Sequence, residues 1–252
     1  MPVIPSRPWS DLEPGMQTGD LILFSGSKTE SQWIELFTGG MFSHSTMIYR
    51  PVSTEPPLMW QEAPEAIVSD PWVKSPDPLK SFHSGAQLGD ALEATQTIQF
   101  QYGDIPYYVQ LDWSRPANLD ELMASFVSTY EGRSFGTVME MALHYAIGHE
   151  FNISSGDDTL YCAALVALTF MNIGLFNDSH PANYYSPNSF VSPQSAKLPW
   201  ATTASFVMPV GIDVPPLSPT TVRRAPSDLA SWPAGPLAPG QLPAPPSASP
   251  NS

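Results

Sequence analysis

Cys162 is the only cysteine in the chain, and it lies where an acidic loop passes into an apolar segment. Asp157, Asp158 and Thr159 precede it, and all three residue types are good helix N-caps. A helix capped at Asp158 or Thr159 places Cys162 in its first turn, where free backbone N–H groups and the helix dipole favour a thiolate. Cys162 is therefore a candidate nucleophile. The alternative is a packing role, because free cysteines are usually buried.

A nucleophilic thiol needs a base, which is most often a histidine. His44 begins a predicted strand, and a strand end is a rigid mount with an exposed tip. His144 and His149 lie about 140° apart on a helix, so they do not share a face and the zinc pattern HExxH is absent. His83 and His180 are predicted surface residues. His44 is thus the candidate base, and the alternative is a half-buried strand histidine.

A third group should orient the imidazole of the base. Gln61 and Glu62 lie at the end of the next predicted strand, and only one of them can face His44 because successive strand residues point to opposite sides. Glu62 would stabilise the imidazolium by charge, whereas Gln61 could only hold the tautomer. We therefore expect Glu62 to be the orienting group. The alternative for Glu62 is a carboxylate that faces solvent.

Short strands early and helices late, without regular βαβ alternation, predict an α+β fold. Apolar runs and loose alternation predict strands at 19–26, 42–50, 57–63, 66–70 and 105–113. Helical spacing of apolar residues predicts helices at 31–40, 118–132, 137–150 and from Thr159 to Gly174.

The chain divides into three parts by composition. Residues 1–15 form a proline-rich arm, residues 16–212 form one domain, and residues 213–252 are rich in Pro, Ala and Ser. The last segment has no hydrophobic period and is predicted to be a disordered tail of polyproline character. It could offer PxxP ligands to a partner, so an interaction protein that acts through this tail is one reading of function.

The net charge of −14 argues against nucleic acid and against docking on an anionic membrane. A single cysteine excludes an intramolecular disulfide and a structural zinc site of several thiolates. No signal peptide is visible, and the apolar stretch from Cys162 to Phe176 is too short to span a bilayer. We therefore expect a cytoplasmic protein that uses neither a metal nor another cofactor.

The order of motifs resembles a known family. "GDLILFSG", "FSHSTMIYR", "WQEAPEAIV", "IPYYVQLDW", "EGRSFG", "LYCAALVALTFMNIGL" and "SPNSF" follow one another as in the YiiX-like, circularly permuted papain-fold hydrolases. These are relatives of NlpC-type peptidases and of lecithin retinol acyltransferase. The resemblance covers roughly residues 16 to 210. It implies an antiparallel sheet packed against a nucleophile helix.

The resemblance also implies roles for individual residues. Cys162 would be the thiolate nucleophile, with its own backbone N–H in an oxyanion hole, His44 the base and Glu62 the orienter. The family's Ser-His and Tyr-Cys pairs match Ser43 and Tyr161, which with Gln61 are candidates for oxyanion or substrate contacts.

The reaction that follows from these roles is hydrolysis or acyl transfer through a thioester on Cys162. The substrate would be an amide or an ester, so a cysteine peptidase (thiol protease), an amidase and an acyltransferase of lipid metabolism are all included. Ala163-Ala164 depart from the Ser-Glu that often follows the family's nucleophile. A non-catalytic binding module on the same fold therefore stays open as an alternative.

Overall fold

The computed structural model describes residues 4–26, 40–63, 85–133, 138–154, 161–191 and 194–216. The predicted strand at 66–70 and all but the last residue of the predicted helix at 31–40 lie outside these ranges. The same is true of Asp157, Asp158 and Thr159, of His83 and, from residue 217 on, of the predicted tail.

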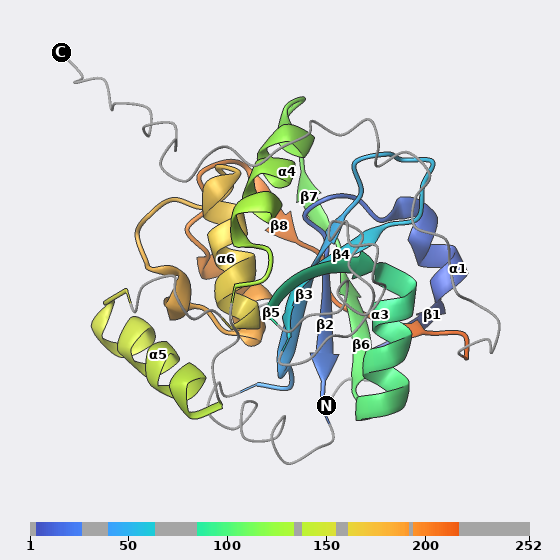
Figure 1. Cartoon of the computed structure of the whole chain (residues 1–252), viewed down its shortest axis with the longest axis horizontal. Helices are drawn as coiled ribbons and strands as arrows, with labels where there is room; N and C mark the ends of the chain where they lie inside the picture. The colour runs from blue at the N-terminus through green and yellow to red at the C-terminus, as the bar shows by residue number, and fades with distance from the viewer. Residues whose placement is uncertain are drawn as a thin grey trace.

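A mainly antiparallel sheet forms the centre of the described structure (Figure 1). Only its β1–β9 edge pair is parallel; the other neighbours in the sheet run antiparallel. In sheet order the strands are β1 (Ser6–Pro8), β9 (Val210–Asp213), β6 (Ile105–Val109), β2 (Leu21–Ser25), β3 (His44–Tyr49), β4 (Leu58–Ala63) and β5 (Gly85–Asp90). A separate pair is formed by β7 (Leu111–Trp113) and β8 (Ala204–Phe206).

Helices cover both faces of this sheet, so the predicted α+β class is confirmed (Figure 1). They are α1 (Trp9–Leu12), α3 (Ala91–Thr97), α4 (Leu119–Tyr130), α5 (Val138–Phe151) and α6 (Cys162–Asn172). Short turns of other helix types are η1 (Glu13–Gly15), the π-helical η3 (Ile98–Tyr102), η4 (Ala182–Tyr184), η5 (Pro187–Phe190) and η6 (Gln194–Lys197).

Strand β2 shows how the sheet separates two cores. Its residues are apolar at four consecutive positions, which is typical of a strand buried on both faces. Leu21 and Leu23 pack in a cluster with residues of α4 and α6. Ile22 and Phe24 pack in a second cluster with residues of α1 and α3. We call these the α6 face and the α3 face of the sheet.

Helix α6 is the core helix of the molecule. Most of its residues from Cys162 to Phe170 are buried, because they are apolar or small on every side. The chain leaves the helix at Gly174, whose φ of 75° is in the left-handed region that favours glycine. Leu175 and Phe176 then return to the core through hydrogen bonds to the carbonyl of Phe170.

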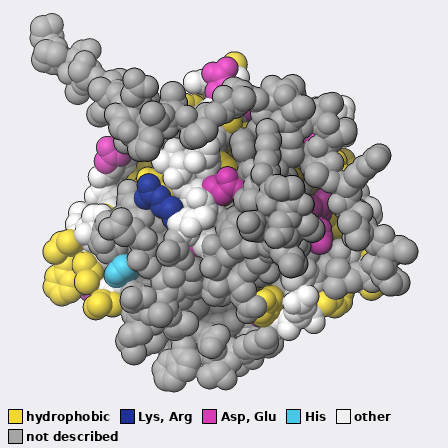
Figure 2. Space-filling view, viewed as in Figure 1, with side chains coloured by type: hydrophobic (Ala, Val, Ile, Leu, Met, Phe, Trp, Pro, Cys, Tyr) yellow, Lys and Arg dark blue, Asp and Glu magenta, His cyan; other side chains and the backbone are white. Residues whose placement is uncertain are grey.

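Helix α5 differs from α6, because apolar residues of its described part are exposed. Leu143 and Phe151 are exposed, as is Ile153 just beyond the helix end. Figure 2 shows hydrophobic side chains gathered at the left edge of the molecule, where Figure 1 places α5. None of the helices in the described ranges is long and apolar enough to cross a membrane.

One prediction of local structure differs from what the structure has. The predicted strand at 105–113 is divided at Gln110, because the carboxylate of Asp20 accepts the Leu111 N–H and the following residues pair with β8 in place of the main sheet. Within the proline-rich arm, β1 pairs with β9, and Trp9 is buried in the core of the α3 face. The high proline content of this segment gives no sequence pattern from which its core residues can be recognised.

Candidate functional site

Cys162 is the first residue of α6, and its side chain is only 6% exposed. This confirms the predicted place in the first turn. The N-cap position is occupied by Tyr161, which makes no side-chain cap, so the helix does not begin at Asp158 or Thr159 as predicted. Thiolate character therefore has to come from the backbone amides of α6 itself and from its neighbours in the sheet.

Polar groups of β3 and α6 near the sulfur of Cys162 favour its charged form. They are the backbone N–H and the hydroxyl of Ser45 and the backbone N–H groups of Ala163 and Cys162, and each lowers the pKa of the thiol. Burial acts in the opposite direction and is the largest effect, so the pKa of Cys162 is raised above its ordinary value of 9.0. The low thiol pKa expected from the sequence is thus wrong, because desolvation outweighs the helix N-terminus.

Glu62 is an ionisable neighbour of this thiol. Its side chain is fully buried, and neither carboxyl oxygen has a hydrogen-bond partner among the described residues. Burial, and secondly the nearby thiol of Cys162, raise the pKa of Glu62 to about 9. Glu62 is therefore a neutral carboxylic acid at pH 7 and not the carboxylate that the sequence prediction assumed.

His44 does not face this thiol. It is paired in register with Phe24, and the two rings lie 5.7 Å apart between centroids. Phe24 belongs to the α3 face. Directly paired residues share a face and successive residues alternate, so His44 lies on the α3 face while Ser45 and Cys162 lie on the α6 face. The predicted Cys162–His44 dyad is not brought together.

Gln61 is the residue that contacts His44, with Oε1 of the amide 3.3 Å from Nε2 of the imidazole. This contact is a hydrogen bond to the amide oxygen in the tautomer that carries the imidazole proton on Nε2. Burial lowers the pKa of His44, while the bond to Gln61 and the charge of Asp104 act in the opposite sense. The prediction that Glu62 orients His44 is wrong, because the alternation of β4 turns Glu62 to the other face.

The two remaining candidates hold backbone segments in place. Ser43 donates both its N–H and its hydroxyl to the carbonyl of Phe24, which closes the start of β3 onto β2. The hydroxyl of Tyr161 lies 2.7 Å from the carbonyl oxygen of Asn183 and 2.9 Å from that of Tyr185 and donates to this pair. Both side chains position the elements that carry His44 and Cys162.

Ser45 and Asn188 were not singled out from the sequence. The side-chain amide of Asn188 accepts from the N–H of Phe42 at 3.0 Å and donates to its carbonyl at 2.9 Å. It therefore satisfies both backbone groups of Phe42, as a neighbouring strand would. This contact fixes the backbone that leads into β3 across 146 residues of sequence. Strand alternation alone could have identified Ser45, because it places Ser45 on the face of β3 opposite to His44. Nothing in the local sequence predicts that Asn188 pairs with Phe42.

Among the described residues, no three His, Cys, Asp or Glu side chains are grouped so that they could hold a metal ion. The chemistry that these residues offer is that of a thiol and a neutral carboxylic acid, buried together at the start of α6.

No protein-family model and no curated protein matches the chain. Among solved structures, the chain is similar to the crystal structure of metalloprotein yiiX from Escherichia coli O157:H7, DUF1105. The TM-score is 0.40 and the sequence identity 16%, over 83% of this chain and 93% of that chain. A likeness of this size transfers no residue role to this chain.

Proposed function

We propose that the protein is a thiol-dependent hydrolase or acyltransferase in which Cys162 is the nucleophile and Glu62, in place of His44, handles the proton. The substrate class is an amide or ester, either a peptide or a lipid acyl group. The fold that goes with this proposal is the circularly permuted papain-like arrangement, in which a nucleophile helix packs against an antiparallel sheet.

One observation carries the proposal: at a helix N-terminus, a single buried sulfur lies beside polar groups of Ser45 and α6 that favour a thiolate and beside the protonated carboxyl group of Glu62. Backbone N–H groups at a helix start stabilise a thiolate, and they equally stabilise the oxyanion of an acyl-transfer intermediate. A carboxylic acid that is neutral at pH 7 can donate a proton to a leaving group.

The reaction balances with these two groups alone. The thiolate of Cys162 attacks the carbonyl carbon, and the bond to the leaving amine or alcohol breaks as that group takes the proton of Glu62. Water, or another acceptor, then attacks the thioester and gives its proton to the Glu62 carboxylate. The thiolate leaves, and both groups return to their starting protonation states.

The proposal predicts an alkaline pH optimum. The reactive form has a deprotonated Cys162 and a protonated Glu62, although both groups have raised pKa values. The population of this form, and with it the activity, rises with pH up to the Glu62 pKa of about 9 and falls once the pH passes the raised pKa of Cys162. The two apparent pKa values of such a profile belong to the pair.

The test is turnover of a panel of p-nitrophenyl esters and peptide p-nitroanilides at pH 7 to 10, with mass spectrometry of an acyl-enzyme trapped during turnover. We expect one acyl group on Cys162, and loss of turnover in Cys162→Ala. Glu62→Gln should lower kcat by about 10²-fold or more, the size of general acid–base effects. His44→Gln should retain kcat within a few fold.

The outcome that overturns the proposed roles is the reverse pattern, in which His44→Gln abolishes turnover and Glu62→Gln retains it. That result would restore His44 as the base and require β3 to present its other face. Turnover that survives in Cys162→Ala would remove the thiol from the reaction.

A second candidate function is a non-catalytic binding module, and the burial of the thiol favours it. Cys162 is 6% exposed and its pKa is raised, as for a packed cysteine. This reading predicts that Cys162→Ser keeps every measured property of the protein. An acyl-enzyme on Cys162 would decide against it.

A further inference from the structure

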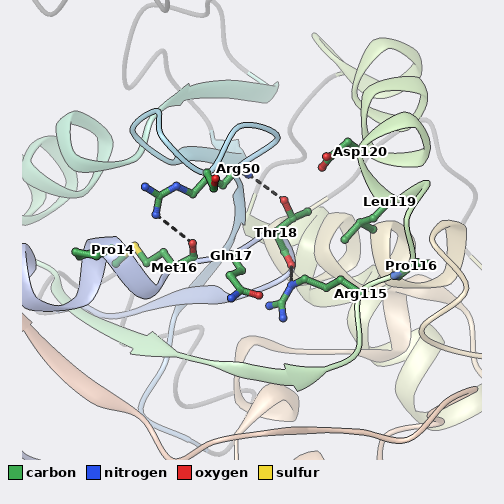
Figure 3. A pocket seen from close by; sticks show the side chains of 10 residues that line it. Pro14, Met16, Gln17, Thr18, Arg50, Arg115, Pro116, Leu119 and Asp120 are labelled. Carbon is green, nitrogen blue, oxygen red and sulfur yellow. Dashed lines mark hydrogen bonds between the residues drawn. The ribbon is translucent and has the colours of Figure 1, made fainter.

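A separate pocket lies at the opposite end of β3 from Cys162, with a volume of about 260 Å³ (Figure 3). It is formed where Arg50 follows β3, beside the segment from Pro14 to Thr18 and the first turn of α4. This is smaller than the sites that take drug-sized ligands, which begin at about 300 Å³. Its occupant would be a small molecule.

Arg50 supplies a positive charge to this pocket, and no carboxylate of the described residues pairs with it. Its Nη1 donates to the carbonyls of Glu13 at 2.6 Å and Met16 at 3.2 Å, and its Nε donates to the carbonyl of Glu55 at 3.0 Å. Carbonyl oxygens fix the guanidinium in position but leave its charge uncompensated. A positioned cation of this kind is suited to a carboxylate or a phosphate.

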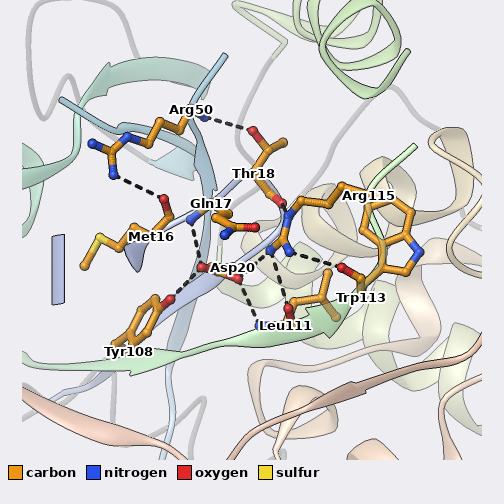
Figure 4. Close-up of polar contacts among 9 residues, drawn as sticks. All are labelled: Met16, Gln17, Thr18, Asp20, Arg50, Tyr108, Leu111, Trp113 and Arg115. Atoms are coloured by element: carbon orange, nitrogen blue, oxygen red, sulfur yellow. Dashed lines mark hydrogen bonds and ion pairs between the residues drawn. The ribbon is translucent and has the colours of Figure 1, made fainter. Parts of the chain in front are cut away.

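Arg115, the second arginine of the pocket, is already neutralised. Its Nη2 lies 2.8 Å from Oδ1 of the buried Asp20, and its Nε donates to the carbonyl of Thr18 at 2.7 Å (Figure 4). The same carboxylate also accepts from the N–H groups of Gln17 and Leu111. Arg115 therefore belongs to the framework under the pocket, and Arg50 is the available charge.

Asp120 supplies the opposite charge to the same pocket. It lies in the first turn of α4, and Figure 3 shows it and Arg50 on two sides of Thr18. No hydrogen bond or ion pair to another described side chain engages its carboxylate, and partial burial raises its pKa. Asp120 and Arg50 thus line one pocket without neutralising each other.

We propose that this pocket binds a small zwitterion, an amino acid or a short peptide, whose carboxylate meets Arg50 and whose ammonium group meets Asp120. A phosphate would be repelled by Asp120, and a simple amine by Arg50. The side chains of Met16 and Leu119 offer apolar contact to the body of such a ligand. The protein's charge of −14 further disfavours a ligand that is only anionic.

The test is an NMR titration of the full chain with four probes: glycylglycine, N-acetylglycylglycine, glycylglycinamide and inorganic phosphate. We expect glycylglycine to bind more tightly than each blocked dipeptide by about two- to fivefold, the size of an exposed ion pair. Shift changes should map to residues 14–18, 50–53 and 115–120. Equal binding of the three dipeptides, tighter binding of phosphate, or shift changes elsewhere overturns the proposal.

Two variants assign the charges. Asp120→Asn should remove the preference for glycylglycine over N-acetylglycylglycine and leave the preference over glycylglycinamide. Arg50→Lys, which keeps the charge but not the three carbonyl bonds, should bind all dipeptides more weakly. Asp112→Asn is the matched control on the exposed side of β7, and an equal effect there contradicts the role of Asp120. Cys162→Ala should bind normally, so this test is independent of the proposed reaction.

Discussion

Oε1 of Gln61 lies 3.3 Å from Nε2 of His44, so these two residues of neighbouring strands share one face of the sheet. Gln61 and His44 point to the α3 face. Glu62 and Cys162 meet on the α6 face. The chain therefore carries two separate sets of polar groups, one built on an imidazole and one on a thiol.

Glu62→Gln should stabilise the protein increasingly as the pH rises. The folded state keeps the Glu62 proton up to about pH 9, whereas the unfolded chain releases it near the ordinary value of 4.5. Unfolding therefore releases a proton between these values, and wild-type stability falls with rising pH by up to about 1.4 kcal/mol per pH unit. Urea unfolding from pH 5 to 9 measures the difference between wild type and variant. Glu121→Gln, an exposed residue of α4, is the control and should show no such trend.

Cys162 should react slowly with iodoacetamide at pH 7, because burial keeps its thiol protonated. The rate should rise toward a plateau well above pH 9. Glu62→Gln should shift this curve to lower pH, since it removes a neighbour that becomes anionic in the same range. His44→Gln should leave the curve unchanged, and a shift in that variant would mean that the imidazole reaches the thiol.

His44 should make the protein less stable in mild acid. Its pKa is lowered in the folded state, so unfolding takes up a proton once the pH falls below the ordinary value of 6.5. Stability should fall below that pH by up to about 1.4 kcal/mol per unit until the folded pKa is reached. Thermal unfolding of His44→Gln from pH 7 to 5 should lack this component. A parallel decline in both proteins would contradict it.

Asp20→Ala should be among the most destabilising single changes. The carboxylate is fully buried, and it accepts from the backbone N–H groups of Gln17 and Leu111, from the hydroxyl of Tyr108 and from Arg115. Removing one partner of a buried ion pair costs about 3–5 kcal/mol. Urea denaturation measures this loss, and a loss below about 1 kcal/mol would show that the network contributes little.

Asn188→Ala should loosen the entry to β3. Two hydrogen bonds join its amide to the backbone of Phe42, and their loss leaves a buried N–H and a buried carbonyl without partners. A cost of about 1–3 kcal/mol follows for such groups. Hydrogen exchange should speed up at Phe42 and Ser43 before the rest of the sheet. Unchanged exchange there would assign the role to other contacts.

The sequence predicted the strands and helices whose patterns are strong. The apolar run of β2, the stripe of α4 and the apolar α6 are found near their predicted bounds, because each must bury its residues wherever it packs. It did not predict β5, whose Gly85–Asp90 segment is rich in glycine and polar residues yet is almost entirely buried. That strand is held in the sheet by its pairing with β4, and no local sequence pattern predicts it.

The sequence by itself determined that Cys162 lies in the first turn of an apolar helix, and that only one of Gln61 and Glu62 can face His44. Both statements follow from the fixed periods of helix and strand. Only the tertiary structure decided which face of β3 and β4 the helix α6 covers, and so it placed Glu62 beside the thiol and Gln61 beside the imidazole. The same packing decided the charge states, because burial of Cys162 and Glu62 outweighs the donors at the helix start.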